Sequence, residues 1–145
     1  MTAQSITARA VNLLSRREHS QAELRTKLRK AEFELDDINE TIDKLTKADI
    51  QSDARFAENY LRYRSQRGFG SQKIRLELKE RGVDSDTINT AFDQVEIDWF
   101  ELTVTVRHKR FGAQAPDDLK DRAKQQRFLQ YRGFTHEQIN ESLNS

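Results

Sequence analysis

The chain has 145 residues, with 25 basic and 24 acidic side chains, so its formal net charge is only +1. It contains no cysteine, which excludes disulfides and thiol chemistry. No apolar run approaches the roughly 18 residues that a membrane span needs. The first five residues lack a charged segment followed by an apolar stretch, so we expect no secretory signal and a cytoplasmic location.

Three helices are predicted in the first third of the chain. Apolar residues within 8–14 are spaced for one face of a helix. Ser20 and Glu23 form a capping box, in which each side chain accepts from the backbone amide of the other residue. A third helix should begin near Asp36 or Asp37, because carboxylates favour the positive start of a helix. The residues expected to be buried here are Leu24, Leu28, Phe33, Ile38, Ile42 and Leu45.

The middle third follows the same plan. Asp49 or Ser52 can cap its first helix, and residues 67–71 form the following turn. Gly82 should end the second helix, since glycine readily adopts the left-handed conformation of a helix end. Asp84 or Ser85 can cap the third. The apolar stripes of these helices are Phe56, Tyr60, Tyr63, Ile74, Leu78, Ile88, Ala91, Phe92 and Val95.

The last third opens at Asp98 with a segment that runs to about Arg110. Its β-branched residues 103–106 favour a strand, but the repeated plan favours a helix, and we predict a helix. Residues 111–116 form a loop, and Pro116 favours the start of a helix at the next two aspartates. Gly133 should end that helix. Ile139 and Leu143 are expected on the buried face of a short last helix.

The strongest pattern is an internal repeat. The series Leu24, Leu28, Phe33 and Ile38 recurs about 50 residues later as Ile74, Leu78, Val83 and Ile88. About 51 residues after that, its last three positions recur as Leu129, Phe134 and Ile139. Self-similarity at this period is typical of modular, repeat-built proteins that present binding surfaces. The sequence therefore predicts an all-α protein of three tandem three-helix repeats, forming an elongated modular body, straight or curved. The expected boundaries are 1–48, 49–97 and 98–145.

Charge is segregated along the chain. Residues 55–81 and residues 107–132 each carry a net charge of +5, whereas residues 84–101 contain acidic but no basic side chains. A neutral protein can in this way present a local positive face to phosphates. Two interpretations stay open for these blocks: ordinary solvated helix surface, or a shared binding face. Phe56, Tyr60 and Tyr63 are interpreted as a buried stripe, which leaves the neighbouring arginines exposed; these are Arg55, Arg62 and Arg64.

No motif indicates catalysis. His19, His108 and His136 are scattered and lack metal-ligand spacing. The aspartate pairs at 36–37 and 117–118 are explained by helix capping better than by a two-metal nuclease. The turn at 67–70 lacks the continuation of a phosphate-binding loop. We therefore expect no enzyme activity, no catalytic residue, no cofactor and no metal site.

Beyond these patterns, the chain resembles a known family. The segment 53–57, followed by Arg64, Gly70 and Arg81-Gly82-Val83, resembles the central module of RecX regulatory proteins. Residues 17–28 are similar to the first repeat of that family. The stretches 97–99 and 126–134 are similar to its third repeat in the proteobacterial form. The resemblance extends from about Ala8 to Leu143. One departure is Lys30-Ala31-Glu32-Phe33, where the other two repeats have Arg-Gly.

The resemblance implies a regulator of the RecA recombinase, and thereby of homologous recombination, DNA repair and the SOS response. Members bind RecA, lodge in the groove of the RecA–DNA filament, and suppress its ATPase, filament growth and strand exchange. Many bind DNA weakly, and they use no cofactor. We expect a monomer without membrane contact. Two alternatives remain: a general nucleic-acid-binding helical protein that acts independently of RecA, and the metal nuclease.

Charge placement, rather than the family pattern, selects the residues expected to contact the filament and DNA phosphates. They belong to the basic segments of all three repeats and would give affinity without sequence specificity. The predicted basic face consists of Arg16, Arg17, Arg25, Arg62, Arg64, Arg67, Lys73, Arg75, Arg81, Arg122, Lys124, Arg127 and Arg132.

Overall fold

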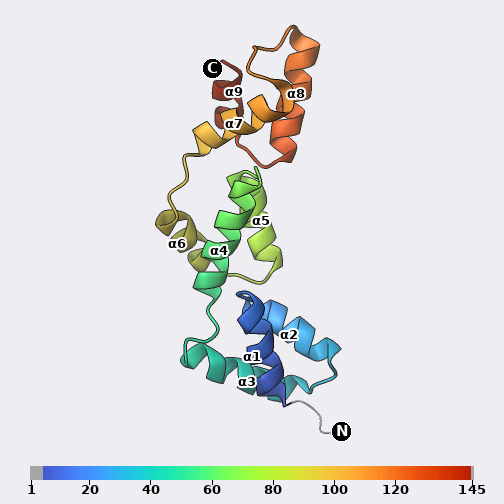
Figure 1. Ribbon diagram of the computed structural model, residues 1–145, viewed down its shortest axis with the longest axis vertical. Helices are drawn as coiled ribbons and strands as arrows, with labels where there is room; N and C mark the ends of the chain where they lie inside the picture. The colour runs from blue at the N-terminus through green and yellow to red at the C-terminus, as the bar shows by residue number, and fades with distance from the viewer. Residues whose placement is uncertain (1–4, 145) are drawn as a thin grey trace. The chain divides into compact units, whose positions relative to one another are not determined.

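A computed structural model describes residues 5–144, so Met1–Gln4, which belong to the segment examined for a secretory signal, and Ser145 lie outside the described residues. Regular structure in the described part is entirely helical, in nine helices grouped by three (Figure 1). The all-α prediction is confirmed. The helices are α1 (Ile6–Arg16), α2 (Gln21–Lys30), α3 (Leu35–Lys47), α4 (Asp53–Gln66), α5 (Ser71–Glu80), α6 (Ser85–Gln94), α7 (Trp99–Phe111), α8 (Leu119–Tyr131) and α9 (His136–Leu143).

Capping chemistry explains most of the observed boundaries. The capping box at the start of α2 is confirmed, with Ser20 and Glu23 each accepting from the other's amide. Ahead of α6, Asp84 Oδ1 accepts from the Thr87 amide at 2.8 Å. This hydrogen bond lowers the pKa of the Asp84 carboxyl. The β-branched segment of α7 is helical, as predicted, and Thr103 donates its hydroxyl to the Trp99 carbonyl four residues back.

Two aspartate pairs lie where helices begin. Asp36 and Asp37 occupy the first turn of α3, one residue later than the observed start at Leu35. Asp118 is the N-cap of α8 and accepts from the Asp121 amide at 2.8 Å. Asp118 therefore agrees with the capping interpretation. Ahead of α3 the N-cap is instead Glu34, without a side-chain hydrogen bond, so Asp36 and Asp37 contribute only negative charge at the positive end of that helix.

Contacts group the chain into two compact units. Unit 1 takes the chain up to Tyr60 together with Leu78–Phe92, and unit 2 takes Leu61–Glu77 together with the chain from Asp93 onward. The helices of the middle repeat therefore contribute residues to both units. The expected repeat boundaries at 48/49 and 97/98 remain a prediction.

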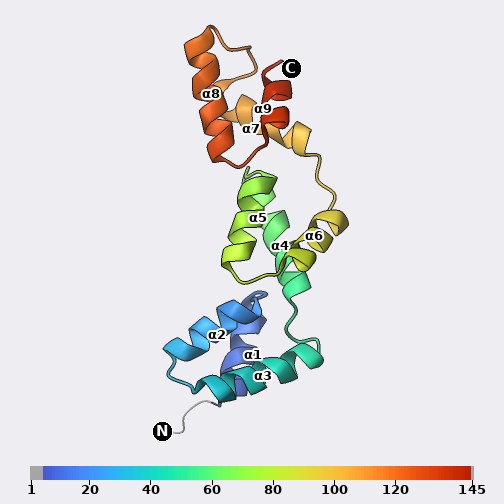
Figure 2. The same ribbon diagram turned by 180° about the vertical axis from the view of Figure 1, so that it is seen from behind.

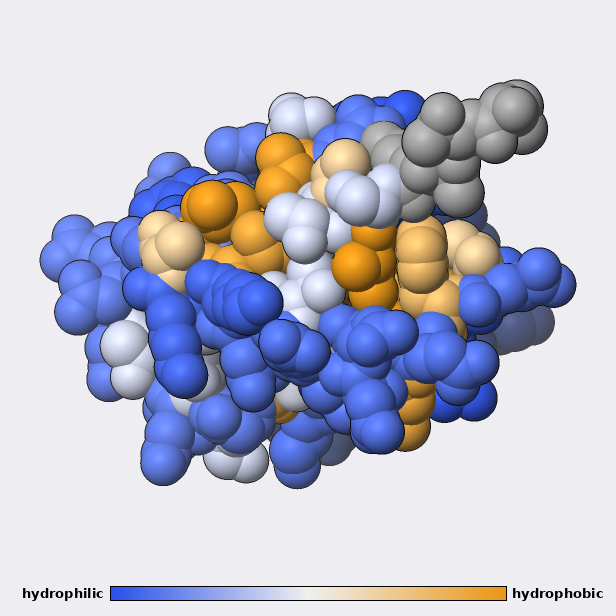
Figure 3. Space-filling view, turned by 90° about the horizontal axis from the view of Figure 1, so that it is seen from below, coloured by the Kyte–Doolittle hydropathy of each residue, from blue (hydrophilic) through white to orange (hydrophobic). Residues whose placement is uncertain are grey.

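The core of unit 1 is built around the first three helices, which pack on one another in both views (Figures 1 and 2). The cluster of six buried residues between these helices includes Leu24, Leu28 and Ile38, each with no exposed surface. Phe33 is only partly buried against this core. Figure 3 shows a face on which hydrophobic side chains gather within a hydrophilic border. Val11 and Leu35 are among the apolar residues of unit 1 that reach the surface.

The core of unit 2 is built from the repeat positions equivalent to those buried in unit 1. Leu129, Phe134 and Ile139 are buried as predicted, together with Val106 and Leu143. Trp99, Leu102 and Phe128 pack against this cluster while keeping part of their surface. The apolar spacing of the repeat therefore identified the buried face correctly in both units.

The second helix of each repeat ends in the same way. The amides of Phe33, Val83 and Phe134 donate to the carbonyls of Leu28, Leu78 and Leu129, at 3.2, 3.1 and 3.2 Å. This is the Schellman pattern, which needs a left-handed residue at the turn. Gly82 and Gly133 supply it with φ of 80° and 98°. In the first repeat Glu32 adopts φ of 69°, so this helix ends like the other two although it lacks a glycine.

A recurring junction joins the start of one second helix to the end of the next. In unit 1, the Ser20 hydroxyl donates to the Arg81 carbonyl at 2.7 Å. The backbones approach so closely that a Cβ on Gly82 would lie 2.4 Å from the Ala22 Cβ. The serine hydroxyl at the start of α2 thus satisfies a carbonyl that the end of α5 leaves free.

Unit 2 contains the corresponding junction between α5 and the turn that follows α8 (Figures 1 and 2). The Gly70 amide donates to the Arg132 carbonyl at 2.7 Å, and the Gln72 amide donates to the Gly133 carbonyl at 3.0 Å. A Cβ on Gly70 would lie only 2.4 Å from the Gly133 carbonyl carbon. Glycine is therefore required by the contact itself.

A buried histidine connects the end of α1 with the last turn of α2 in unit 1. His19 Nδ1 lies 3.0 Å from the Arg17 carbonyl, and His19 Nε2 lies 2.9 Å from Lys27 Nζ. This arrangement fits a neutral ring that donates through Nδ1 and accepts through Nε2. Burial lowers the pKa of His19, and the positive charges of Arg17 and Lys27 act in the same direction.

This lowered pKa predicts a pH dependence of stability. As the pH falls below about 6.5, the unfolded chain gains a proton at His19 before the folded chain does. The free energy of unfolding should therefore be highest above that pH and should decrease as the pH is lowered to about 5.5. His19→Gln should reduce this slope in urea denaturation, whereas His136→Gln, at an exposed histidine, should keep it. Equal slopes in wild type and His19→Gln would contradict the assignment.

Candidate nucleic-acid interface

The predicted basic residues of the first repeat differ in their exposure and in their side-chain partners. Arg16 is exposed. Arg17 forms an ion pair with Glu23 at 3.0 Å while its side chain stays 48% exposed. Arg25 donates through Nε to Asn39 Oδ1 at 3.0 Å. Of these three cations, Arg16 is exposed, whereas Arg17 and Arg25 already have partners within the first repeat.

In the middle repeat, the expectation of exposure holds for Arg62 but is wrong for Arg64. The Arg64 guanidinium forms two hydrogen bonds to Glu77, at 2.9 and 2.8 Å, and lies 3.7 Å from the centre of the Phe69 ring. Its side chain is 19% exposed. Arg55 is half-buried, and hydrogen bonds from its guanidinium to Asp49 and Glu18 raise its pKa.

The predicted aromatic stripe of α4 is also partly wrong. Phe56 is buried, but Tyr60 is half-buried and Tyr63 is 53% exposed. The buried face of this helix follows Ala57, Leu61 and Ser65, which recur every four residues. Tyr63 lies two positions from Leu61 or Ser65, and two residues of a helix turn the side chain to the opposite side.

The third repeat contributes both exposed and buried cations. Lys124 and Arg127 are exposed, and Arg122 is partly so. Arg107, counted in the second basic block, is fully buried. Its guanidinium donates to the Gln114 carbonyl and to Gln125 Oε1, and burial lowers its pKa. This arginine holds the loop between α7 and α8 and cannot contribute to an exposed basic face.

Unit 2 brings several predicted cations together around aromatic rings. The Arg132 guanidinium lies 4.8 Å from the Phe69 ring centre and 5.1 Å from that of Phe128. Lys73 Nζ lies 4.6 Å from the ring centre of Tyr131 and 5.8 Å from that of Phe69. We call these five residues the cation–aromatic cluster. Attraction between the cations and the ring faces fixes both charges in place.

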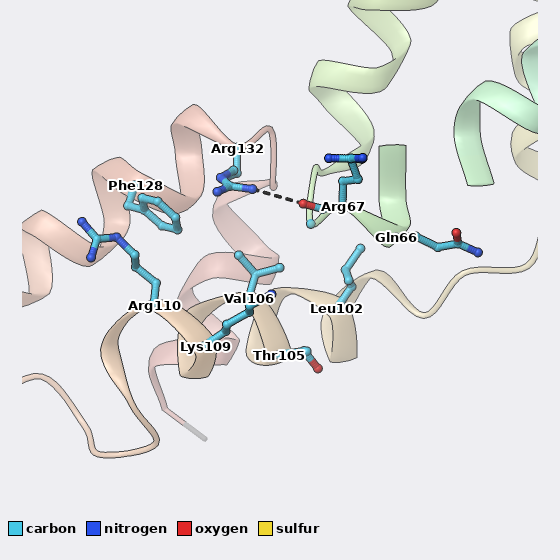
Figure 4. Close-up of a pocket in the computed structure, with 10 residues that line it drawn as sticks. Gln66, Arg67, Leu102, Thr105, Val106, Lys109, Arg110, Phe128 and Arg132 are labelled. Atoms are coloured by element: carbon cyan, nitrogen blue, oxygen red, sulfur yellow. Dashed lines mark hydrogen bonds between the residues drawn. The ribbon is translucent and has the colours of Figure 1, made fainter. Parts of the chain in front are cut away.

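A pocket of about 570 Å³ lies beside this cluster (Figure 4). The lining side chains come from the end of α4 and from α7 and α8. Arg132 reaches into this region and donates to the Arg67 carbonyl at 3.3 Å. The lining residues are Gln66, Arg67, Gly68, Leu102, Thr105, Val106, Lys109, Arg110, Phe128 and Arg132.

Sequence reasoning missed two of the four cations that line this pocket. Lys109 and Arg110 are exposed at the end of α7, and both line the pocket. The run of basic residues 107–110 could have pointed to them in the sequence. Of this run, only Arg107 is fully buried. Arg67 and Arg132, by contrast, were both in the predicted basic face and do line the same pocket.

Between residues 5 and 144, no group of three histidine, cysteine, aspartate or glutamate side chains could hold a metal ion. None of the helices in this range is long and apolar enough to cross a membrane. The cation–aromatic cluster and the pocket beside it instead bring guanidinium and ammonium groups next to aromatic rings. Such groups bind phosphates and flat bases in single-stranded nucleic acids.

Comparison with protein families gives three consecutive matches. Models described as the first, second and third three-helix domains of RecX match residues 8–45, 52–91 and 96–143. The matched segments contain most of α1–α3, most of α4–α6 and all of α7–α9, which agrees with the repeated three-helix plan.

Individual relatives and solved structures agree. "Regulatory protein RecX" from Pectobacterium atrosepticum is 38% identical, and the match covers 90% of each chain. The protein of that name from Pseudomonas entomophila is 40% identical over 92% of this chain and 86% of the relative. The crystal structure of RecX from Lactobacillus salivarius superposes with a TM-score of 0.80 at 25% identity, covering 96% of this chain and 92% of that one. From the three domain matches and this similarity over nearly the whole chain, it follows that the chain belongs to the RecX family of regulatory proteins.

Proposed function

We propose that this chain regulates the RecA recombinase by binding the RecA–DNA filament and inhibiting its ATPase, filament growth and strand exchange. By this action it would limit homologous recombination during DNA repair and the SOS response, as a cytoplasmic monomer without enzyme activity. Membership of the RecX family carries the proposal, since the family's name implies regulation of RecA.

The cation–aromatic cluster supports a surface that binds a polyanion. Lys73 and Arg132 are held against aromatic rings and form no ion pair with a described carboxylate. By contrast, Arg64 is already paired with Glu77. Contacts between such cations and phosphates would give weak DNA binding without sequence preference, which suits a protein acting along a filament.

Charge reversal at three exposed members of the predicted basic face tests this proposal. Arg16, Lys124 and Arg127 are exposed and form no ion pair with a described residue. The triple variant Arg16→Glu, Lys124→Glu, Arg127→Glu should need about tenfold more protein to inhibit the RecA ATPase on single-stranded DNA, since a charged hydrogen bond contributes about 1.5–3 kcal/mol. Arg64 is left out, because a glutamate there would face Glu77.

The matched control reverses three exposed cations outside the predicted face, Arg29, Lys30 and Lys47. Both triple variants should melt near the wild-type temperature, and the control should inhibit like wild type. Equal inhibition by all three proteins would refute the surface assignment. Wild-type inhibition only at concentrations that coat the DNA would instead favour the general nucleic-acid-binding alternative.

A further inference from the structure

The pocket beside the cation–aromatic cluster has a basic rim without acidic neighbours. Four cations line it, from Arg67, Lys109, Arg110 and Arg132, and no aspartate or glutamate does. None of the four forms an ion pair with a described residue. In water such a group of like charges is unfavourable, and an anionic ligand relieves the repulsion between them. The rim therefore favours a ligand that carries phosphate.

Two of these cations are held in place before any ligand arrives. The Arg132 guanidinium lies 4.8 and 5.1 Å from the ring centres of Phe69 and Phe128 and also donates to the Arg67 carbonyl. The Arg110 guanidinium lies 5.5 Å from the ring centres of both Phe111 and Phe128. Groups already fixed lose little conformational freedom on binding, so they contribute more to affinity.

The floor of the pocket is apolar. Leu102 and Val106 from α7 and Phe128 from α8 line it between the cations (Figure 4). A volume of about 570 Å³ falls in the range of roughly 300–1,000 Å³ that is typical of small-molecule sites. A ligand matching both parts needs an anionic group for the rim and a flat, weakly polar body for the floor.

We propose that this pocket binds one nucleotide unit, with its phosphate at Lys109, Arg110 and Arg132 and its base against Leu102, Val106 and Phe128. The unit comes either from a free nucleotide or from an unpaired nucleotide in a single strand. If the nucleotide belongs to a single strand, the inference rests on the proposed function, because that strand is the part of the nucleoprotein filament that unit 2 would bind. A base inside a duplex is stacked on both sides and cannot lie on the floor.

The test compares two double variants of the full chain that lose the same charge. Lys109→Gln with Arg110→Gln removes two rim cations. Lys47→Gln with Lys120→Gln removes two exposed cations that neither line the pocket nor belong to the predicted basic face. Fluorescence anisotropy with a labelled oligothymidylate and calorimetry with thymidine monophosphate and ATP separate the two sources. Replacing one thymine by 4-thiothymine allows photocrosslinks to be mapped by mass spectrometry.

Loss of the two rim cations should weaken oligonucleotide binding about tenfold. It should also lower the slope of log affinity against log salt concentration by about 0.7 for each phosphate that the variant no longer neutralises. The control variant should change affinity by less than about twofold. Crosslinks should fall in the peptides containing residues 102–110 or Phe128. Free nucleotides that bind with the same dependence on the rim would identify the ligand as a free nucleotide; binding of oligonucleotide alone would identify a strand.

Three results would overturn the inference: equal weakening in both double variants, crosslinks only outside the pocket, or rim-dependent binding of duplex as tight as that of a single strand. Measurement of RecA ATPase inhibition keeps the two proposals separate. If wild type inhibits RecA but rim loss leaves oligonucleotide binding intact, only the pocket assignment fails. If the pocket binds oligonucleotide but wild type has no effect on RecA, only the regulatory proposal fails.

Discussion

Alanine at Gly70 should destabilise the protein by about 2–4 kcal/mol, through overpacking and the loss of backbone hydrogen bonds. The new Cβ would lie within 2.5 Å of three backbone atoms, the carbonyl group of Gly133 and the amide nitrogen of Phe134. Backbone cannot move aside as a flexible side chain does. The junction must therefore open, with loss of the hydrogen bonds from the amides of Gly70 and Gln72.

Gly112→Ala is the matched control for this substitution. Gly112 has a positive φ of 87°, but a Cβ there would meet nothing within 4 Å. Its cost is backbone strain alone, about 1–3 kcal/mol, because φ of 87° with ψ of 173° is a conformation that few residues other than glycine adopt. Urea denaturation of both variants measures the difference. If Gly70→Ala is no more destabilising than Gly112→Ala, the junction in unit 2 is looser than the hydrogen-bond distances indicate.

The second large effect is expected at Leu78, where alanine should cost about 2–5 kcal/mol because it leaves a cavity in the core. The Leu78 side chain has no exposed surface, and its carbonyl accepts from the Val83 amide at the end of α5. Alanine keeps this backbone hydrogen bond, so the measured loss reports side-chain packing.

Leu76 provides the comparison within the same helix, since it is 57% exposed. Leu76→Ala should change the free energy of unfolding by no more than about 0.5 kcal/mol. Thermal or urea denaturation of both variants checks this difference. A Leu78→Ala variant that melts like wild type would show that the assigned face of α5 is wrong.

Much of the fold was predictable because its determinants are local. The capping box at Ser20 and the stop at Gly82 each depend on a few adjacent residues, and both are found as expected. The β-branched part of α7 was predictable only through the repeat. Glu32 shows the limit of residue-type rules, since a non-glycine adopts the same left-handed turn as Gly82 and Gly133.

The site was less predictable, because partners distant in the sequence decide what a charged side chain does. Arg64 is removed from the free surface by Glu77, and Arg107 is buried beneath the loop that it holds. Neither result follows from helical spacing alone. The pocket needs α4, α7 and α8 to meet, so Lys109 and Arg110 could be counted as charge but not placed.

The division of α5 between the two units bears on how the chain unfolds. Residues through Glu77 belong to unit 2, and residues from Leu78 belong to unit 1. The start of this helix bonds to the carbonyls of Arg132 and Gly133, and the carbonyl of Arg81, just past its end, accepts from Ser20. Melting of this one short helix thus breaks junctions in both units. Neighbouring repeats coupled in this way lose structure together, so cooperativity of unfolding should extend across the repeats instead of stopping at their boundaries.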